Sequence, residues 1–481
     1  MPFNEDLALI GRLVDERGEK AVRLARAVWD AAEPNWREKT SCAVLAQYLE
    51  QEGFSVQHGP CGMETAFLAQ HTQGPGGPVV AFLCEYDALP GLSQAAGQAS
   101  PQPLDGACGH GCGHNLLGAA SAAAAAALKE ALALTGTNAT VRCYGCPAEE
   151  DGGGKVFFAR AGAFDDVDAV FAWHPGDANY VLGQGCLAVT GVLYQFSGRT
   201  AHAAAAPHTG RSALDACELM NVGCNYLREH MLPSARLHYA YRDTGGTAPN
   251  VVPDHACLHY YIRAAKVRDM MELRQRVDDV ARGAALMTGT SLTIRAVDGF
   301  SDYVPNRALS EHLAACLAEV GAPPFDEADR ALARRFADTF DPAALRANVE
   351  GTCEKAGLAA DAFAGKVLDD TVAPYLHDPR VAEPGSTDVG DVSYCAPTAQ
   401  LYCAAQALGT GGHTWQVTAQ SASPIGDKGM LTAAKVLALA GLRAVRDPAL
   451  LALARRQHQA DCPEGYVCPM PPDARPAPAD L

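Results

Sequence analysis

Metal-binding side chains follow apolar runs of this chain at several points, and this pattern constrains the fold more than any other feature. Apolar runs end at Glu85 and Asp87, at Glu149 and Glu150, and at His174. Because ligands of open α/β sheets bind beyond the carboxyl ends of the strands, these side chains should meet in one crevice. The sequence therefore predicts an α/β fold with a doubly wound, largely parallel sheet that carries a metal site.

Two further stretches add metal-binding side chains. Cys112 and His114 stand two residues apart in GHGCGHN, and His413 stands alone in GGHTWQ. Taken singly each is ambiguous, because CxH pairs occur by chance and a lone His is more often structural. A thiolate, imidazoles and a carboxylate together are typical of a zinc site or a site for a similar divalent ion. Their joint occurrence favours a dinuclear site.

The adjacent Glu149 and Glu150 repel one another unless a cation neutralises one of them. A solvated acidic turn is the plainer alternative. Consecutive side chains of extended backbone point in different directions, so one Glu can bind metal while the other acts as a base. The spacing leaves open which Glu has which role.

The order of predicted elements changes at about residue 189. Residues 189–302 read as strand, helix, two strands, helix and strand, which is the ferredoxin-like split motif. We therefore predict a catalytic domain in two parts, 1–188 and 303–481, with this smaller domain inserted between them. The Pro-rich end of the second part is expected to fray. The acidic, Ala-rich segment 323–365 has no predicted role.

Three polar residues of the inserted domain are candidates for substrate binding. His202 lies in a loop of small residues before a helix, Asn250 in a rigid turn between strands, and Arg263 on the strand that follows. Polar groups that rigid turns hold in place suit substrate binding. Ordinary turn chemistry for Asn250 and a surface charge for Arg263 are equally compatible with the sequence.

Composition excludes several classes of partner. The formal net charge is -17 over 481 residues, which argues against binding to nucleic acid or an anionic membrane. The N-terminal residues are charged and amphipathic, so we expect no signal peptide and a cytoplasmic enzyme. The Ala-rich run from Ala119 fits a tightly packed soluble helix better than a membrane span. Cys143 and Cys146 are expected to be buried thiols on a strand and not a redox pair.

Seven strings of the sequence run in the order seen in one protein family: EYDALPG, GHGCGHNLLGAA, PAEEDGGGK, DAVFAWHP, GRTAHAAAAPHTGRSALDA, GGTAPNVVPD and GSTDVGDVSY. They resemble the co-catalytic-metal amidohydrolases and peptidases that include aminoacylases, glutamate carboxypeptidases and plant auxin-conjugate hydrolases. The resemblance covers nearly the whole chain. It implies a metal-bearing α/β domain with an inserted lid through which two chains dimerise.

The resemblance also implies roles for individual residues. The metal-ligand positions are matched by Cys112, His114, Glu150, His174 and His413. Glu149 matches the general base. Asp87 matches an acid that contacts the metal ligands, not the metal itself, and so supports the metal centre. His202 matches the lid histidine that reaches into the neighbouring subunit's site. Asn250 and Arg263 match lid positions associated with the substrate's carboxylate.

Two positions depart from parts of the family. Peptidases with a His-x-Asp motif have His where this chain has Glu85, so metal placement should follow the Cys-x-His branch. Asn115 stands where the auxin-conjugate and aminoacylase branch usually has Asp. This favours the aminobenzoyl-glutamate branch of the family.

The activity implied is metal-dependent hydrolysis of an amide bond. A metal-bound hydroxide formed with Glu149 as base would attack N-acyl or N-aroyl amino acids, aminobenzoyl-glutamate-like or dipeptide-like, that carry a free carboxylate. The cofactor is expected to be two divalent ions per subunit, Zn or Mn. A homodimer through the lid is implied, and a heterodimer with a related subunit stays open. The alternatives are a carbamoylase or deacetylase with the same metal chemistry, or a partner-dependent subunit of a hetero-oligomer.

Overall fold

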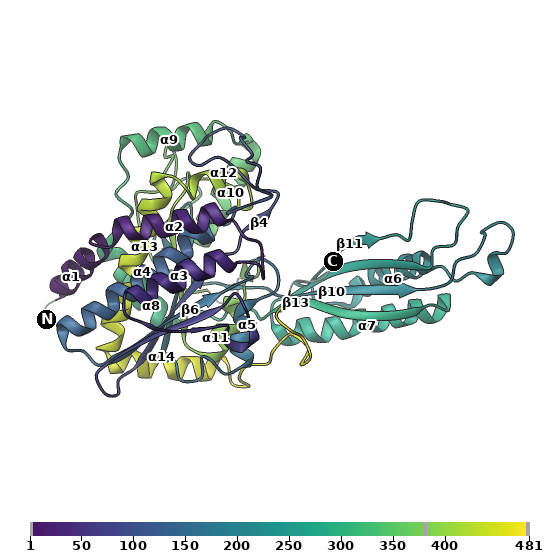
Figure 1. Ribbon diagram of the computed structural model, residues 1–481, viewed down its shortest axis with the longest axis horizontal. Coiled ribbons are helices and arrows are strands. Elements are labelled where there is room, and N and C mark those ends of the chain that lie inside the picture. Colours follow the sequence, from purple (N-terminus) through teal and green to yellow (C-terminus); the bar gives the residue numbers. More distant parts are fainter. Residues whose placement is uncertain (1–2, 379–381, 384, 478–481) are drawn as a thin grey trace.

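A mixed seven-stranded sheet forms the centre of the larger of two lobes (Figure 1). The computed structural model describes residues 3–378, 382–383 and 385–477. In spatial order the strands are β1 (Ser55–His58), β2 (Phe67–Gln73), β6 (Ala139–Cys146), β3 (Val79–Glu85), β7 (Ala169–Gly176), β15 (Thr398–Ala404) and β8 (Tyr180–Val181). The four strands β6, β3, β7 and β15 are parallel.

The prediction of a largely parallel sheet is wrong at both edges. β2 pairs antiparallel with β1 and β6, and β8 pairs antiparallel with β15. The connection between β1 and β2 covers only residues 59–66. A parallel crossover needs a dozen or more residues, so this short connection returns the chain in the opposite direction.

Helices cover both faces of the central sheet, because alternate strand residues point to opposite sides. Phe82 and Cys84 of β3 belong to the larger core, and Ala81 and Leu83 belong to the core on the other face. The first face is covered by α1 (Phe3–Asp15), α2 (Gly18–Ala31), α3 (Lys39–Gln51), α4 (His114–Thr135), α8 (Arg307–Val320) and α13 (Pro424–Val445). The second is covered by α5 (Gly154–Arg160) and α11 (Val389–Cys395).

The Ala-rich α4 is a core helix. Among the described residues it alone is long and apolar enough to cross a membrane, but 83% of its most apolar window is buried inside the protein. It packs against α2, α13 and β3. Its alanines allow this close approach, since a larger side chain would overfill a densely packed interior.

The smaller lobe is a four-stranded antiparallel sheet with two helices on one face (Figure 1). Along the chain its elements are β10 (Ala188–Ser197), α6 (Ala213–Leu227), β11 (Arg236–Asp243), β12 (His255–Ala264), α7 (Val267–Thr288) and β13 (Ser291–Phe300). The spatial strand order is β11-β12-β10-β13. Alternate residues such as Val192, Tyr194 and Tyr260 form its core with both helices. We call this lobe the lid.

The segment without a predicted role contains two helices, α9 (Glu327–Ala337) and α10 (Pro342–Lys355). The chain then completes the central sheet and continues through α12 (Trp415–Gln420), α13 and α14 (Pro448–Asp461). Four short strands form two minor sheets: β4 (Leu89–Pro90) with β5 (Cys108–Gly109), and β9 (Gly185–Cys186) with β14 (Ala382–Glu383).

The expected frayed tail is wrong for residues 462–477, while 478–481 lie outside the described residues. Met470 is buried with Val156 of α5 and with Val189 and Phe300 at the base of the lid. The Arg160 guanidinium donates to two carbonyl oxygens of the tail. Burial of apolar side chains and these hydrogen bonds explain why a Pro-rich segment is ordered here.

Two local features complete the larger lobe. A short break separates α1 from α2, where the Arg17 guanidinium donates to the Leu13 carbonyl oxygen. Cys143 and Cys146 are buried on β6, as expected. Burial raises the pKa of the Cys146 thiol, which disfavours the reactive thiolate.

Candidate metal centre

The order of the central strands brings the predicted metal-binding side chains to one edge of the sheet. Glu85 ends β3, Glu149 and Glu150 follow β6, and His174 lies near the end of β7. These three strands are neighbours and run parallel, so their carboxyl ends meet. Cys112 precedes the first turn of α4, and the loop between β15 and α12 carries His413.

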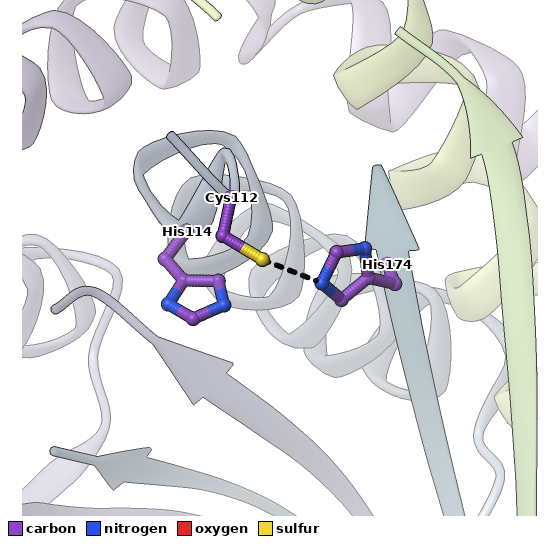
Figure 2. Close-up of side chains that lie close together, drawn as sticks. All are labelled: Cys112, His114 and His174. Carbon is purple, nitrogen blue, oxygen red and sulfur yellow. Dashed lines mark hydrogen bonds between the residues drawn. The ribbon is translucent and has the colours of Figure 1, made fainter. Parts of the chain in front are cut away.

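Cys112, His114 and His174 point toward one another (Figure 2). The Cys112 Sγ lies 3.3 Å from His174 Nε2. His174 Nδ1 lies 2.7 Å from the Pro175 carbonyl oxygen, so it carries the proton and leaves Nε2 directed at the cluster. His114 Nε2 is buried and has no hydrogen-bond partner among the described residues. A buried imidazole nitrogen of this kind is costly unless a ligand engages it.

Two more groups overlap with this one. His413 Nε2 lies 3.2 Å from Glu150 Oε2, and both side chains group with Cys112. His114 Nε2 lies 3.4 Å from Glu85 Oε2 and 3.8 Å from Glu149 Oε2. Within each group the ligand atoms are within 4.8 Å of one another. The buried Glu150 Oε1 is a second atom without a hydrogen-bond partner in the described part of the chain.

Asp87 lies directly behind this cluster. Its Oδ1 is 2.7 Å from His114 Nδ1, and its Oδ2 accepts from the Glu150 backbone N–H at 2.8 Å. Burial would raise the pKa of Asp87, but the charge of His114 and these hydrogen bonds lower it. An ionised Asp87 keeps the proton of His114 on Nδ1 and directs Nε2 into the cluster.

The electrostatics of the cluster favour a bound cation. Burial and then the Glu85 charge raise the pKa of Glu149 well above its ordinary value. Burial and then Glu150 raise the pKa of the Cys112 thiol. Burial and then His114 lower the pKa of His174 to about 4, so that imidazole is neutral. Sulfur, imidazole and crowded carboxylates are a donor set for divalent metal ions, and the residues present fit such ions.

Two buried charged residues next to the cluster escaped the sequence analysis. Lys155 is fully buried, and its Nζ lies 2.7 Å from Glu85 Oε1 and 2.5 Å from Asp388 Oδ1. Asp388 also accepts from the Lys155 backbone N–H at 3.0 Å. Lys155 and Asp388 do stand in two of the quoted strings, PAEEDGGGK and GSTDVGDVSY, but nothing in the sequence pairs them.

Glu38 is another buried acid near the cluster that the sequence did not indicate. It accepts hydrogen bonds from the backbone N–H groups of Trp36 and Ala148 and from the Thr65 hydroxyl. Ala148 has φ +57° and directly precedes Glu149. Glu38 therefore holds the turn that presents Glu149 and Glu150. Burial and then the charge of Asp87 raise the pKa of Glu38 to about 8.

The structure brings His202 and Asn250 together, since the Ala203 N–H donates to the Asn250 carbonyl oxygen at 2.9 Å, but it leaves Arg263 apart from them. His202 and Asn250 lie beyond Ser197 and before His255, which pair at the far end of the lid sheet. Strands β10 and β12 run ten residues from there back to the larger lobe, roughly 30 Å. Arg263 lies at the near end, and its Nη1 donates to the Ser386 hydroxyl of the larger lobe at 2.7 Å.

Comparison with known proteins places this site in a family. The model of peptidase family M20/M25/M40 matches residues 81–357. A p-aminobenzoyl-glutamate hydrolase subunit of Escherichia coli K12 is 41% identical over 99% of this chain and 100% of the relative. The chain belongs to the M20/M25/M40 peptidase family. Its members are metal-dependent hydrolases of amide bonds, and the chain is an enzyme of this kind.

Two other similar proteins support this assignment. A mouse Xaa-Arg dipeptidase is 32% identical over 92% of this chain and 90% of its own length. A solved structure from Bacillus subtilis, described as a dinuclear metal-binding peptidase of the M20 family, has a TM-score of 0.55 at 17% identity. It covers 89% of this chain and 98% of that protein, which shows a shared fold.

Proposed function

We propose that this chain is an amidohydrolase with two divalent ions, Zn or Mn, that cleaves N-acyl or N-aroyl amino acids. The observation that carries the proposal is the overlapping cluster with two buried atoms, His114 Nε2 and Glu150 Oε1, that lack hydrogen-bond partners among the described residues. The side chains that would hold the ions are Cys112, His114, Glu150, His174 and His413. Aminobenzoyl-glutamate-like amides are the first substrates to test, because the 41% identical relative is a p-aminobenzoyl-glutamate hydrolase subunit.

Glu149 is the general base in this proposal. The bound ions would supply Lewis-acid activation of a water molecule and of the amide carbonyl. The Glu149 carboxylate takes a proton from the attacking water and later returns it to the leaving amine. Its position near His114 and Glu85, inside the crowded part of the cluster, supports this role. Asp87 orients His114 throughout the reaction.

The lid, residues 189–302, serves as a dimerisation domain in this proposal. His202 and Asn250 lie about a strand length, roughly 30 Å, from the larger lobe of the same chain. They therefore cannot reach the metal-binding cluster of that chain. His202 of the partner subunit would stabilise the oxyanion, and Asn250 of the partner subunit would contact the substrate. Arg263, at the near end of the same sheet, would bind the substrate's free carboxylate within its own chain.

One finding supports an alternative quaternary structure. The E. coli relative is named as one subunit of its hydrolase, so a hetero-oligomer with a related chain is the alternative to a homodimer. A carbamoylase or deacetylase would use the same metal chemistry on another acyl group. We place the enzyme in the cytoplasm, as its sequence predicts.

Amino acid release from a substrate panel tests the proposal. The purified chain should cleave aminobenzoyl-glutamate, other N-acyl amino acids or dipeptides, lose activity on chelation, and regain it with zinc or manganese. Glu149→Gln should lower kcat by about 10²–10⁴-fold or more while metal content stays unchanged. Wild-type kcat in that variant would refute the base assignment. A metal-loaded but inactive wild-type chain would favour the partner-dependent subunit.

A further inference from the structure

His413 lies on a loop whose position the central sheet does not determine. This loop, residues 405–414, joins β15 to α12, and we call it the His413 loop. The His413 side chain is 57% exposed and its φ is +56°, an unfavourable conformation for a residue other than glycine. Gly411 and Gly412 precede it and add conformational freedom. The rest of the structure must therefore hold His413 at its 3.2 Å approach to Glu150.

Helix α10 holds one end of the His413 loop. The Gly409 N–H donates to Asp177 Oδ2 at 2.8 Å, and its carbonyl oxygen accepts from Asn348 Nδ2 at 3.0 Å. Gly409 has φ +78°, and a Cβ there would lie 2.2 Å from Leu345 Cδ1. The helix thus packs directly on the loop backbone and satisfies the Gly409 carbonyl group, while Asp177 satisfies the Gly409 N–H.

Asp177 connects the same point to a second metal-binding strand. It is buried, and it lies three residues after His174 at the end of β7. Besides the Gly409 N–H, it accepts from the Thr352 hydroxyl of α10 at 3.0 Å. One carboxylate therefore joins the His174 strand, the His413 loop and α10.

The other end of the loop is held by α9 and by the Cys112 turn. The His413 N–H donates to the Gly111 carbonyl oxygen at 3.0 Å, beside Cys112. The Trp415 ring lies 6.4 Å from the Phe336 ring of α9. Gln416 Nε2 donates to the Thr339 hydroxyl, just after α9, at 3.3 Å. Contacts on both sides of His413 thus come from the segment that had no predicted role.

We propose that the α9–α10 segment, together with Asp177, is a positioning scaffold for His413. It sets the geometry, and so the affinity, of the metal position bounded by Cys112, Glu150 and His413. This inference rests on the proposed function, because it takes His413 as a metal ligand. Asn348, Thr352 and Asp177 act through His413 and are positioning residues.

Metal affinity of the full-length chain tests this scaffold. Asn348→Asp keeps the shape but removes the donor to Gly409, and Thr352→Val removes the hydroxyl that Thr352→Ser retains. The metal-free chain is titrated with Zn²⁺ and with Co²⁺, and bound ions per chain, kcat and the apo-protein Tm are measured. Glu350→Ala, on the exposed face of α10, is the matched control.

We expect Asn348→Asp and Thr352→Val to weaken binding of the ion at the position bounded by Cys112, Glu150 and His413 about 10–100-fold. Binding of the other ion should not change. The Co²⁺ spectrum should lose the component that His413→Ala also removes. Thr352→Ser and Glu350→Ala should behave as wild type, and the apo Tm should change little in every variant. This pattern would separate ligand positioning from general stability.

Three results would overturn the scaffold proposal. In the first, Asn348→Asp and Thr352→Val bind both ions with wild-type affinity while His413→Ala loses one. In the second, both variants lose both ions together and their apo Tm falls, which is general destabilisation. In the third, His413→Ala itself keeps both ions at wild-type affinity. That third result would also refute the ligand set of the proposed function, and the first two would leave that set intact.

Discussion

Lys155 should stabilise the chain by neutralising two buried carboxylates. Lys155→Met leaves Glu85 and Asp388, at 4% and 0% side-chain exposure, without their shared cation. Breaking a buried ion pair by removing one partner costs about 3–5 kcal/mol, since an uncompensated charge stays buried. Asp388 keeps the Lys155 backbone N–H and Glu85 keeps His114 nearby, so we expect the lower end, about 3 kcal/mol. Urea unfolding of the metal-free protein measures this change.

A double variant provides the control for this prediction. Lys155→Met with Asp388→Asn removes one of the two orphaned charges and should recover part of the lost free energy of unfolding. Bound metal should also reduce the loss, because Glu85 faces the cluster and a cation would replace Lys155 as its counter-charge. An unfolding free energy of Lys155→Met within about 0.5 kcal/mol of wild type, the range of neutral surface substitutions, would refute the argument. So would a double variant less stable than the single one.

Three further predictions follow from the same contacts. Asp87→Asn should weaken metal binding about 10–100-fold, because an amide orients His114 less well, and zinc titration would measure it; unchanged affinity would contradict that role. Burial raises the pKa of Glu38 from 4.5 to about 8. Wild-type apo protein should therefore lose stability as the pH rises from about 4.5 through 8. Glu38→Gln should remove this loss, which amounts to about 4–5 kcal/mol at pH 9. Thermal melts of wild type and Glu38→Gln at pH 5 and pH 9 test this. A stability difference between the two proteins that is equal at both pH values would refute it. Deletion of the chain after Asp461 should cost about 2 kcal/mol for the lost burial of Met470, seen as a lower Tm, and an unchanged Tm would contradict tail docking.

The sequence predicted the features that local patterns encode. Apolar runs ending in Glu85, Glu149 and His174 implied parallel strands with a shared edge, and the structure has them there. The alternating elements of the lid follow the expected order. The antiparallel edges arise from connections too short for a parallel crossover, residues 59–66 between β1 and β2 and residues 177–179 between β7 and β8.

Buried charges could not be predicted from the sequence. Lys155 and Asp388 are 233 positions apart, and Glu38 and Ala148 are 110 apart. In sequence such residues look like ordinary surface charges, because only tertiary contacts remove them from water. The docking of the tail was missed for the same reason, since its partners Val156 and Phe300 lie far away along the chain.

The strand order has a consequence for how the enzyme is made. β7, which carries His174, pairs with β15, and about 240 residues separate His174 from His413. At about 5–20 residues per second, a ribosome needs roughly 10–50 s to synthesise that stretch. During this time the β7 edge lacks its neighbour, while the contiguous lid can already fold. In the proposed site, complete metal loading must therefore wait until His413 has emerged, and until β15 arrives the β7 edge is open to mispairing.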